Sequence, residues 1–103
     1  MFRIPHPVHP GEILREEYLL PLGLTPYALA KALDVPRTRI ERLARGETAV
    51  TTDTALRLAR YFGTSPDMWM NLQVAFDLTN DALAKAAEID RIVPRAAAAA
   101  QAA

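Results

Sequence analysis

The sequence predicts an all-α fold, a single compact domain of about five to six helices. Three observations lead to this prediction. Apolar residues recur at helical spacing, and each apolar stretch is bounded by a capping residue, a proline or a glycine. No stretch shows the alternation of polar and apolar residues that is typical of a strand. The 103 residues suit one domain, and half of them are apolar, so a core can form without disulfides or metals. There is no cysteine, which excludes thiol catalysis and cysteine-based zinc sites.

The N-terminal residues predict an extended arm followed by a first helix. Residues 1–10 hold three prolines, which cannot continue a regular helix. His6 and His9 lie in this arm without a third ligand nearby, so we expect no metal site there. Residues 11–20 carry an apolar stripe with acidic residues near the positive N-terminal end of the helix, and Pro21 and Gly23 are expected to end it.

A short helix, a turn and a second helix follow, and they form the most informative part of the sequence. Thr25 is a hydroxyl N-cap with Pro26 at the first helical position, so a helix is expected over residues 26–33. Pro36 restrains the turn, because it disfavours helical backbone in the residue before it. A second helix is expected over residues 37–45. The predicted core residues of these two helices are Leu29, Ala30, Leu33, Ile40, Leu43 and Ala44.

Three more helices are expected after this pair. Hydroxyl caps predict one helix over residues 52–62 and another from residue 66 onward. Thr79 or Asn80 is expected to cap a sixth helix that reaches about residue 92. The alanine-rich residues 95–103 follow, and a stretch this short is only marginally stable as an isolated helix. The expected organisation is therefore an extended arm (1–10), a helix–turn–helix domain (11–93) and a flexible tail (94–103).

The helix that begins at residue 66 is apolar over a wide arc, which indicates two packing partners, with a second subunit as one candidate. Its aromatic and long apolar residues fit a core or a dimer contact better than a platform for stacking bases. The candidate residues for a homodimer interface are Met68, Trp69, Leu72 and Phe76.

Positive charge is concentrated in the middle of a neutral chain. The 12 basic and 12 acidic residues argue against a general polyanion binder. Residues 31–60 nevertheless hold seven cations and four anions. A helix–turn–helix places its second helix in the DNA major groove, where an arginine can donate two parallel hydrogen bonds to guanine. The predicted function is therefore sequence-specific binding to double-stranded DNA.

The motifs around this pair of helices resemble one family. The core LTPYALAKALDVPRTRIERLARG resembles the helix–turn–helix of phage-repressor-type regulators. The flanking HPGEILREEYLLPLGLT and TALRLARYFGTSPDMWMNLQVAFDL narrow the resemblance to HigA-type antitoxins, over about residues 9–78. The resemblance implies a homodimer that binds a palindromic operator, represses its own operon, and neutralises a cognate toxin of the mRNA-endonuclease type by binding it.

The resemblance also assigns DNA-contacting positions. Two departures from the family pattern affect them: Asp34 stands where glycine is frequent, and Pro36 stands where a serine or threonine usually caps the second helix. Arg39 is also placed to lean sideways towards a phosphate. The implied base-reading residues are Arg37, Thr38, Arg39 and Arg42, and the implied phosphate-contacting residues are Tyr27, Arg45, Thr48 and Thr51.

Several alternatives remain open from the sequence. The arginines also fit a solvated helix face, although the turn and the caps favour DNA. Arg57 and Arg60 are expected to be exposed, solvated charges. The alternative functions are a stand-alone transcriptional regulator without a toxin, and a protein-interaction module that keeps the helix–turn–helix as a scaffold.

No catalytic arrangement stands out in the sequence. We find no serine–histidine pair, metal-binding cluster or phosphate loop, so no enzymatic activity, cofactor, metal or small-molecule substrate is expected. No apolar run has the length of a membrane span, so no membrane partner is expected and the expected location is the cytoplasm.

Overall fold

The structure is a computed structural model, and it describes residues 7–97. Within that range all regular structure is helical, which confirms the predicted fold class. The first three elements follow one another without a break, and the middle one has the wider turns of a π-helix. The elements are α1 (Pro10–Ile13), η1 (Leu14–Leu19), α2 (Leu20–Leu22), α3 (Pro26–Leu33), α4 (Arg37–Ala44), α5 (Thr52–Phe62), α6 (Pro66–Ala84) and α7 (Ala86–Asp90).

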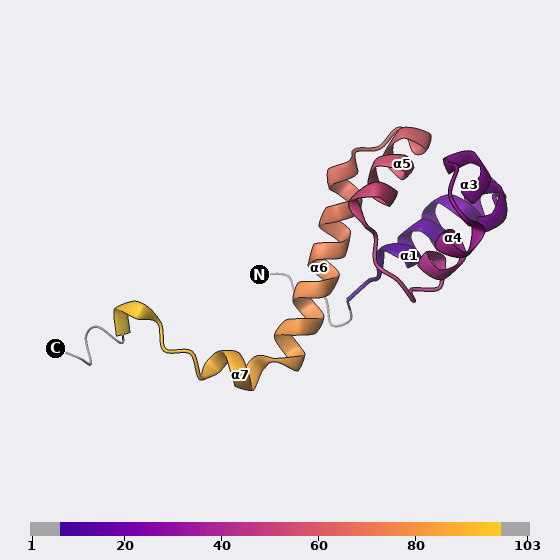
Figure 1. Cartoon of the computed structure of the whole chain (residues 1–103). Helices are drawn as coiled ribbons and strands as arrows, with labels where there is room; N and C mark the ends of the chain where they lie inside the picture. The colour runs from indigo at the N-terminus through magenta and orange to yellow at the C-terminus, as the bar shows by residue number, and fades with distance from the viewer. Residues whose placement is uncertain (1–6, 98–103) are drawn as a thin grey trace.

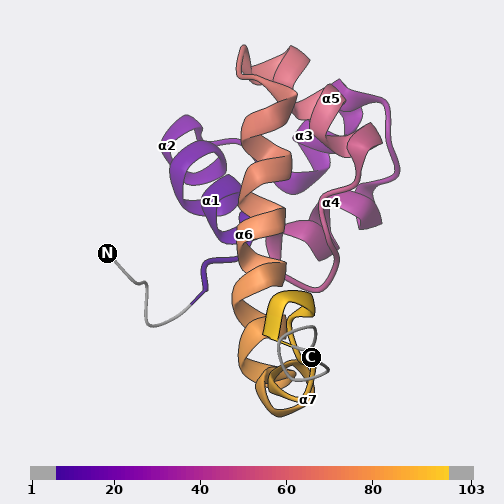
Figure 2. The same cartoon turned by 90° about the vertical axis from the view of Figure 1, so that its left-hand side faces the viewer.

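Helix α6 is the longest helix of the described residues, and it connects the packed head to α7. Its first half runs along one side of the packed head and contacts α5 and α1 (Figure 1 and Figure 2). Its second half leaves this packed head and leads to α7 (Figure 1). Residues 80–97 are all exposed, so the packed core ends before the expected domain boundary at residue 93. No helix within residues 7–97 has both the length and the apolar character needed to cross a membrane.

The core contains the apolar stripes that the sequence predicted for α3 and α4, and all six of those residues are buried. Trp69 of α6 lies at the centre with no exposed surface, and its indole N–H donates to Thr64 Oγ1 at 2.9 Å. Trp69 as a dimer contact was therefore wrong, because a side chain enclosed by its own protomer has no surface to offer a second subunit. Met68 and Leu72 are partly buried against the same core.

The predicted N-caps are confirmed at three helices. The hydroxyls of Thr25, Thr51 and Ser65 accept hydrogen bonds from backbone N–H groups in the first turns of α3, α5 and α6, at 3.1, 3.2 and 3.1 Å. The turn between α3 and α4 contains Asp34 and Pro36, the two residues that depart from the family pattern. Asp34 takes the left-handed conformation with φ 58°, and Pro36 precedes α4 without a side-chain cap.

Of the two residues predicted to end the first helix, Gly23 does so but Pro21 does not. The helix continues through Leu22, and the Leu20 N–H donates to the Arg15 carbonyl five residues earlier. Pro21 lies inside the short last turn, next to the left-handed Gly23 that ends the helix. Proline has no N–H to contribute, and an early position in a helical turn tolerates that loss best.

The sixth helix does not begin at Thr79 or Asn80 as predicted. Helix α6 runs through both residues to Ala84, and the Thr79 hydroxyl donates to the Ala75 carbonyl at 2.9 Å instead of capping a new helix. A hydroxyl bonded to the preceding turn is compatible with continuous helix. The shorter α7 then follows after Lys85. In the tail, residues 95–97 form a helical turn, and residues 98–103 lie outside the described range.

His9 is part of the packed structure, although the sequence placed it in the N-terminal arm. Its Nδ1 accepts a hydrogen bond from the Gly11 N–H at 2.8 Å and so caps α1. Its ring meets Phe76 of α6 edge-on, with centroids 4.8 Å apart. Burial lowers the pKa of His9 below its ordinary value, although the Thr48 backbone and the Asp77 carboxylate act in the opposite direction. His6 lies outside the described residues.

Candidate nucleic-acid interface

The candidate interface is built on α4, whose two faces differ sharply. Ile40, Leu43 and Ala44 are buried, because they repeat at helical spacing against the core. Two contacts from the first helix fix this helix in place: Gly11 packs against the Leu43 carbonyl, and Arg15 Nη1 donates to the Ala44 carbonyl at 2.6 Å. The outward face carries the four predicted base-reading residues Arg37, Thr38, Arg39 and Arg42, all of which are exposed.

Two hollows of similar size flank α4. A hollow of about 310 Å³ lies between α3 and the start of α4, and its wall includes Tyr27, Lys31 and Arg37. A hollow of about 320 Å³ lies between α4 and the start of α5, and its wall includes Thr48 and Thr51. The structure therefore brings three of the predicted phosphate-contacting residues to the two sides of the predicted base-reading helix.

Two arginines of the candidate interface form local ion pairs. Arg37 Nε lies 3.5 Å from Glu41, and Arg45 Nε lies 3.0 Å from Glu47. Both arginine side chains are about 60% exposed, at 60% and 61%. Ion pairs this exposed contribute about 0–1 kcal/mol, so they do not hold a guanidinium against a competing phosphate. Arg42 makes no ion pair with any residue in the range 7–97.

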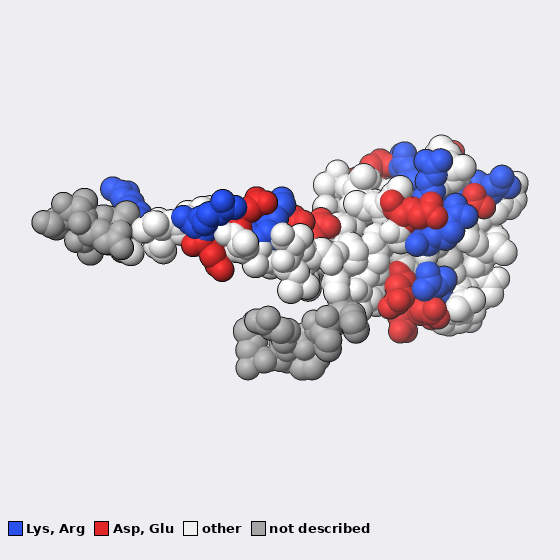
Figure 3. All heavy atoms as spheres, turned by 90° about the horizontal axis from the view of Figure 1, so that it is seen from below, with Lys and Arg blue, Asp and Glu red and all other residues white. Residues whose placement is uncertain are grey.

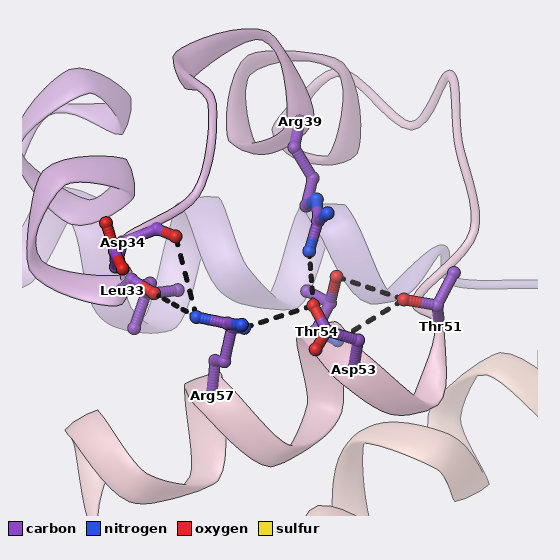
Figure 4. A network of polar contacts seen from close by, with 7 residues as sticks. All are labelled: Leu33, Asp34, Arg39, Thr51, Asp53, Thr54 and Arg57. Atoms are coloured by element: carbon purple, nitrogen blue, oxygen red, sulfur yellow. Dashed lines mark hydrogen bonds and ion pairs between the residues drawn. The ribbon is translucent and has the colours of Figure 1, made fainter.

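Arg39 differs from these arginines, because it reaches a carboxylate on another helix. Its Nη1 bonds to Asp53 Oδ2 at the start of α5, and Arg57 Nε bonds to the same oxygen at 3.0 Å (Figure 4). Hydrogen bonds from Arg39 and then Arg57 lower the pKa of Asp53 below its ordinary value. The sequence predicted that Arg39 reads bases, but in this structure its guanidinium is bonded to Asp53 of the same chain.

Arg57 is not the solvated charge that the sequence suggested. Its Nη1 donates to the Leu33 carbonyl at 2.8 Å, one of the last carbonyls of α3, in addition to the bond from its Nε to Asp53. A helix leaves its final carbonyls without partners inside the helix, and an arginine from another helix satisfies one of them here. Arg60 is exposed, as expected.

The loop that leads from α4 to α5 is held by a residue that the sequence analysis missed. Gln73 of α6 is buried, and its Oε1 accepts a hydrogen bond from the Val50 N–H at 2.8 Å. Its amide donates to Asp77 Oδ1 at 3.0 Å. The available signal was an amide side chain with apolar residues on both sides, Leu72 and Val74. Gln73 thus sets the position of the loop that carries Thr48.

Thr51 is less free than its predicted phosphate contact requires. Its Oγ1 accepts from the Thr54 N–H, and its hydroxyl also lies 3.2 Å from Thr54 Oγ1 (Figure 4). The cap occupies much of the hydrogen-bonding capacity of this side chain. Thr48 and Thr51 are both exposed, but the Thr48 side chain makes no such hydrogen bond within residues 7–97.

Acidic and basic side chains lie next to one another over the head of the molecule on the face shown in Figure 3. That face is not a continuous basic surface. Non-specific DNA binding depends on the number of phosphates neutralised, so mixed charge limits it, while a few exposed arginine forks can still read base edges. Within residues 7–97 no three histidine, aspartate or glutamate side chains are grouped so that they could hold a metal ion.

Comparison with known proteins agrees with this arrangement. The profile of the helix-turn-helix family matches residues 14–69. Virulence-associated protein I of Dichelobacter nodosus is 58% identical over 71 residues, which are 69% of this chain and 66% of that protein. Antitoxin HigA-1 of Vibrio cholerae is 42% identical over 72 residues, 70% of this chain and 68% of that protein. The chain thus spans about two thirds of the length of these curated relatives.

A solved structure extends the similarity to three dimensions. The antitoxin HigA of Pseudomonas aeruginosa, solved with higBA promoter, superposes on the present structure with a TM-score of 0.85 at 41% sequence identity. The match covers 87% of this chain and 99% of that one.

Proposed function

Because this chain belongs to the helix-turn-helix family, within which it is similar to HigA-type antitoxins, we propose that it is a DNA-binding antitoxin. In this role it binds its own operator, represses its own operon, and neutralises a cognate toxin of the mRNA-endonuclease type by binding it. The chemistry of DNA recognition comes from α4, and the antitoxin role comes from the family resemblance.

The observation that carries the DNA-binding part is the exposed face of α4. Arg42 is exposed and makes no ion pair within residues 7–97, and Arg37 is paired only weakly on the same helix. A guanidinium in this position can donate two hydrogen bonds to guanine O6 and N7 in the major groove. The exposed Thr38 offers a hydroxyl to a base or a methyl group to thymine. Tyr27 and Thr48, on the two sides of the helix, suit the flanking phosphates.

The proposed active form is a homodimer on a palindromic operator. Two-fold symmetric helix–turn–helix proteins bind half-sites about 34 Å apart, one helical turn of DNA. Met68 and Leu72 pack against the protomer's own core, and Phe76 lies against the His9 ring. The exposed large apolar side chains of α6 that remain for a second subunit are Val74, Leu78 and Leu83, with exposed fractions of 49%, 65% and 68%.

Arg42→Ala tests the proposed DNA contact. We expect it to weaken binding to the upstream DNA of this gene by about 1–3 kcal/mol, roughly 5- to 150-fold, and to relax the preference at one base position. Fluorescence anisotropy with a labelled duplex measures the affinity, and a set of single-base variants measures the preference. Arg60→Ala is the matched control, because Arg60 is also an exposed arginine, and it lies on α5 outside both hollows that flank α4. Equal effects of the two substitutions would refute the role of Arg42.

Co-expression with the product of the neighbouring gene tests the antitoxin role. A small protein encoded directly beside this gene should co-purify with the full-length chain, and the chain should relieve its growth inhibition. Specific operator binding without such a partner would instead support the stand-alone regulator.

A further inference from the structure

The network around Asp53 links α4 and α5 at one carboxylate oxygen, and Arg57 extends it to the end of α3. Arg39 from α4 and Arg57 from α5 both bond to Asp53 Oδ2, and Figure 4 shows the two side chains converging on it from different helices. The pair of Arg39 and Asp53 spans 14 residues, whereas Arg37 and Arg45 pair with acids no more than four residues away. This long-range pair is therefore the one that ties the candidate base-reading helix to the next helix.

The two arginines are held unequally. Arg57 also donates to the Leu33 carbonyl at 2.8 Å, with the Asp34 carbonyl 3.5 Å away, so it is anchored to the end of α3. The Arg39 side chain has Asp53 as its one hydrogen-bonding partner within residues 7–97. The position of the Arg39 guanidinium therefore depends on Asp53 alone, whereas Arg57 is held by both Asp53 and the end of α3.

Arg39 also lies at a place where a phosphate would compete for it. Its side chain lines the hollow between α4 and α5, together with Arg42, Thr48 and Thr51. Without Asp53, this hollow would present two arginines from adjacent turns of one helix. With Asp53 in place, the charge of one of them is already neutralised.

We propose that Asp53 is a positioning residue that holds Arg39 away from DNA, so that the affinity of the protein for DNA of unrelated sequence stays low and base reading rests on Arg42. This inference rests on the proposed DNA-binding function and assigns a specificity-determining role within it. The cause is electrostatic, because each additional phosphate contact strengthens binding to every sequence alike.

The test compares four full-length proteins: wild type, Asp53→Asn, Arg39→Ala and the double variant. Affinity is measured for the upstream operator duplex and for a duplex of unrelated sequence over a range of salt concentrations. In Asp53→Asn the released Arg39 should add about one phosphate contact. The plot of log K against log salt then steepens by about 0.9, and affinity for the unrelated duplex rises about 8-fold at ~0.1 M salt.

The other variants assign this gain to Arg39. Arg39→Ala alone should keep the wild-type salt slope, and the double variant should lose the gain seen in Asp53→Asn. A slope that becomes shallower by about 0.9 in Arg39→Ala would overturn the proposal, because Arg39 would then already contact phosphate in the wild type. An unchanged affinity for the unrelated duplex in Asp53→Asn would overturn it as well.

Asp67→Asn controls for the loss of one negative charge. Asp67 occupies the same position in the first turn of α6 as Asp53 does in α5, two residues after the hydroxyl cap. It makes no ion pair with the residues described, so its substitution changes the charge and the helix-dipole interaction without releasing an arginine. An equal gain in both variants would overturn the proposal.

A measurement without DNA separates this inference from the proposed function. In the free protein, a carboxyl NMR titration should show the pKa of Asp53 rising towards its ordinary value in Arg39→Ala. If the wild type fails to select the operator but this pKa rises, the proposed function fails and the pairing of Arg39 with Asp53 stands. If the pKa does not change, the pairing itself is refuted. Arg39→Gln, which removes the charge with a smaller change in shape, repeats the comparison should Arg39→Ala unfold.

Discussion

Gly11→Ala tests whether the contact between α1 and α4 is as close as the structure indicates. A Cβ at position 11 would lie 1.7 Å from the Leu43 carbonyl oxygen and 2.8 Å from its carbon. Ordinary contacts between carbon and a carbonyl oxygen are no shorter than about 3.3 Å, so α1 would need to move by roughly 1.6 Å. The obstacle is backbone inside a helix, and it cannot rotate away as a side chain can.

The two physical effects of this substitution have opposite signs. Alanine favours a helix over glycine by up to about 1 kcal/mol, whereas overpacking a tight contact costs about 1–3 kcal/mol. The contact with backbone places the cost near the upper limit, so we expect a net loss of about 2 kcal/mol. For a domain of this size that corresponds to a fall of roughly 8–16 °C in Tm.

Urea and thermal unfolding followed by far-UV circular dichroism measure this difference. Glu12→Ala is the control, because Glu12 is exposed on the same helix and its substitution changes helix propensity without creating a contact with α4. Below its Tm, Gly11→Ala should also bind the operator more weakly, since α1 supports the candidate base-reading helix. A variant as stable as the wild type, or more stable, would refute the close packing of Gly11 on Leu43.

Two further substitutions test buried polar contacts. Gln73→Leu removes the acceptor of the buried Val50 N–H and should destabilise the fold by about 1–3 kcal/mol in urea unfolding, so an unchanged free energy of unfolding would show that this bond is dispensable. The lowered pKa of His9 means that the unfolded chain binds more protons near pH 6, so stability should fall as pH decreases from about 6.5 through the lower pKa of the folded state. His9→Asn keeps an acceptor for the Gly11 N–H and should flatten this dependence between about pH 7 and pH 5, whereas parallel curves for the two proteins would contradict the assignment.

The starts of three helices were predictable because each depends on a few adjacent residues. Thr25, Thr51 and Ser65 cap helices through contacts with N–H groups three residues later, and sequence spacing alone determines such contacts. The error at Thr79 arose because a threonine hydroxyl can make either of two local hydrogen bonds, one that caps a helix and one to the preceding turn of the same helix. Thr79 has the chemistry of a cap, but its hydroxyl is satisfied by the preceding turn, and no glycine or proline follows to stop the helix.

The sequence indicated that α6 has buried apolar residues, but not which part of the molecule buries them. The wide apolar arc of α6 correctly indicated two sets of neighbours, yet periodicity does not distinguish the protomer's own core from a second subunit. The head encloses Trp69 because α6 packs against both α5 and the first helix, and only the tertiary arrangement reveals this. The partly buried cap at His9 was missed for the same reason, since its aromatic neighbour Phe76 is distant in sequence.

The candidate site shows the same division between local and long-range information. The outward positions on α4 follow from helical periodicity, so Arg37 and Arg42 were located correctly from the sequence. What each arginine bonds to does not follow from periodicity, because Asp53 belongs to another helix. Charge counting gave Arg39 the same weight as Arg42, although a carboxylate already neutralises Arg39 and none described neutralises Arg42. For a protein with no net charge, the proposed selectivity for DNA therefore depends less on how many arginines it has than on which ones it leaves unpaired.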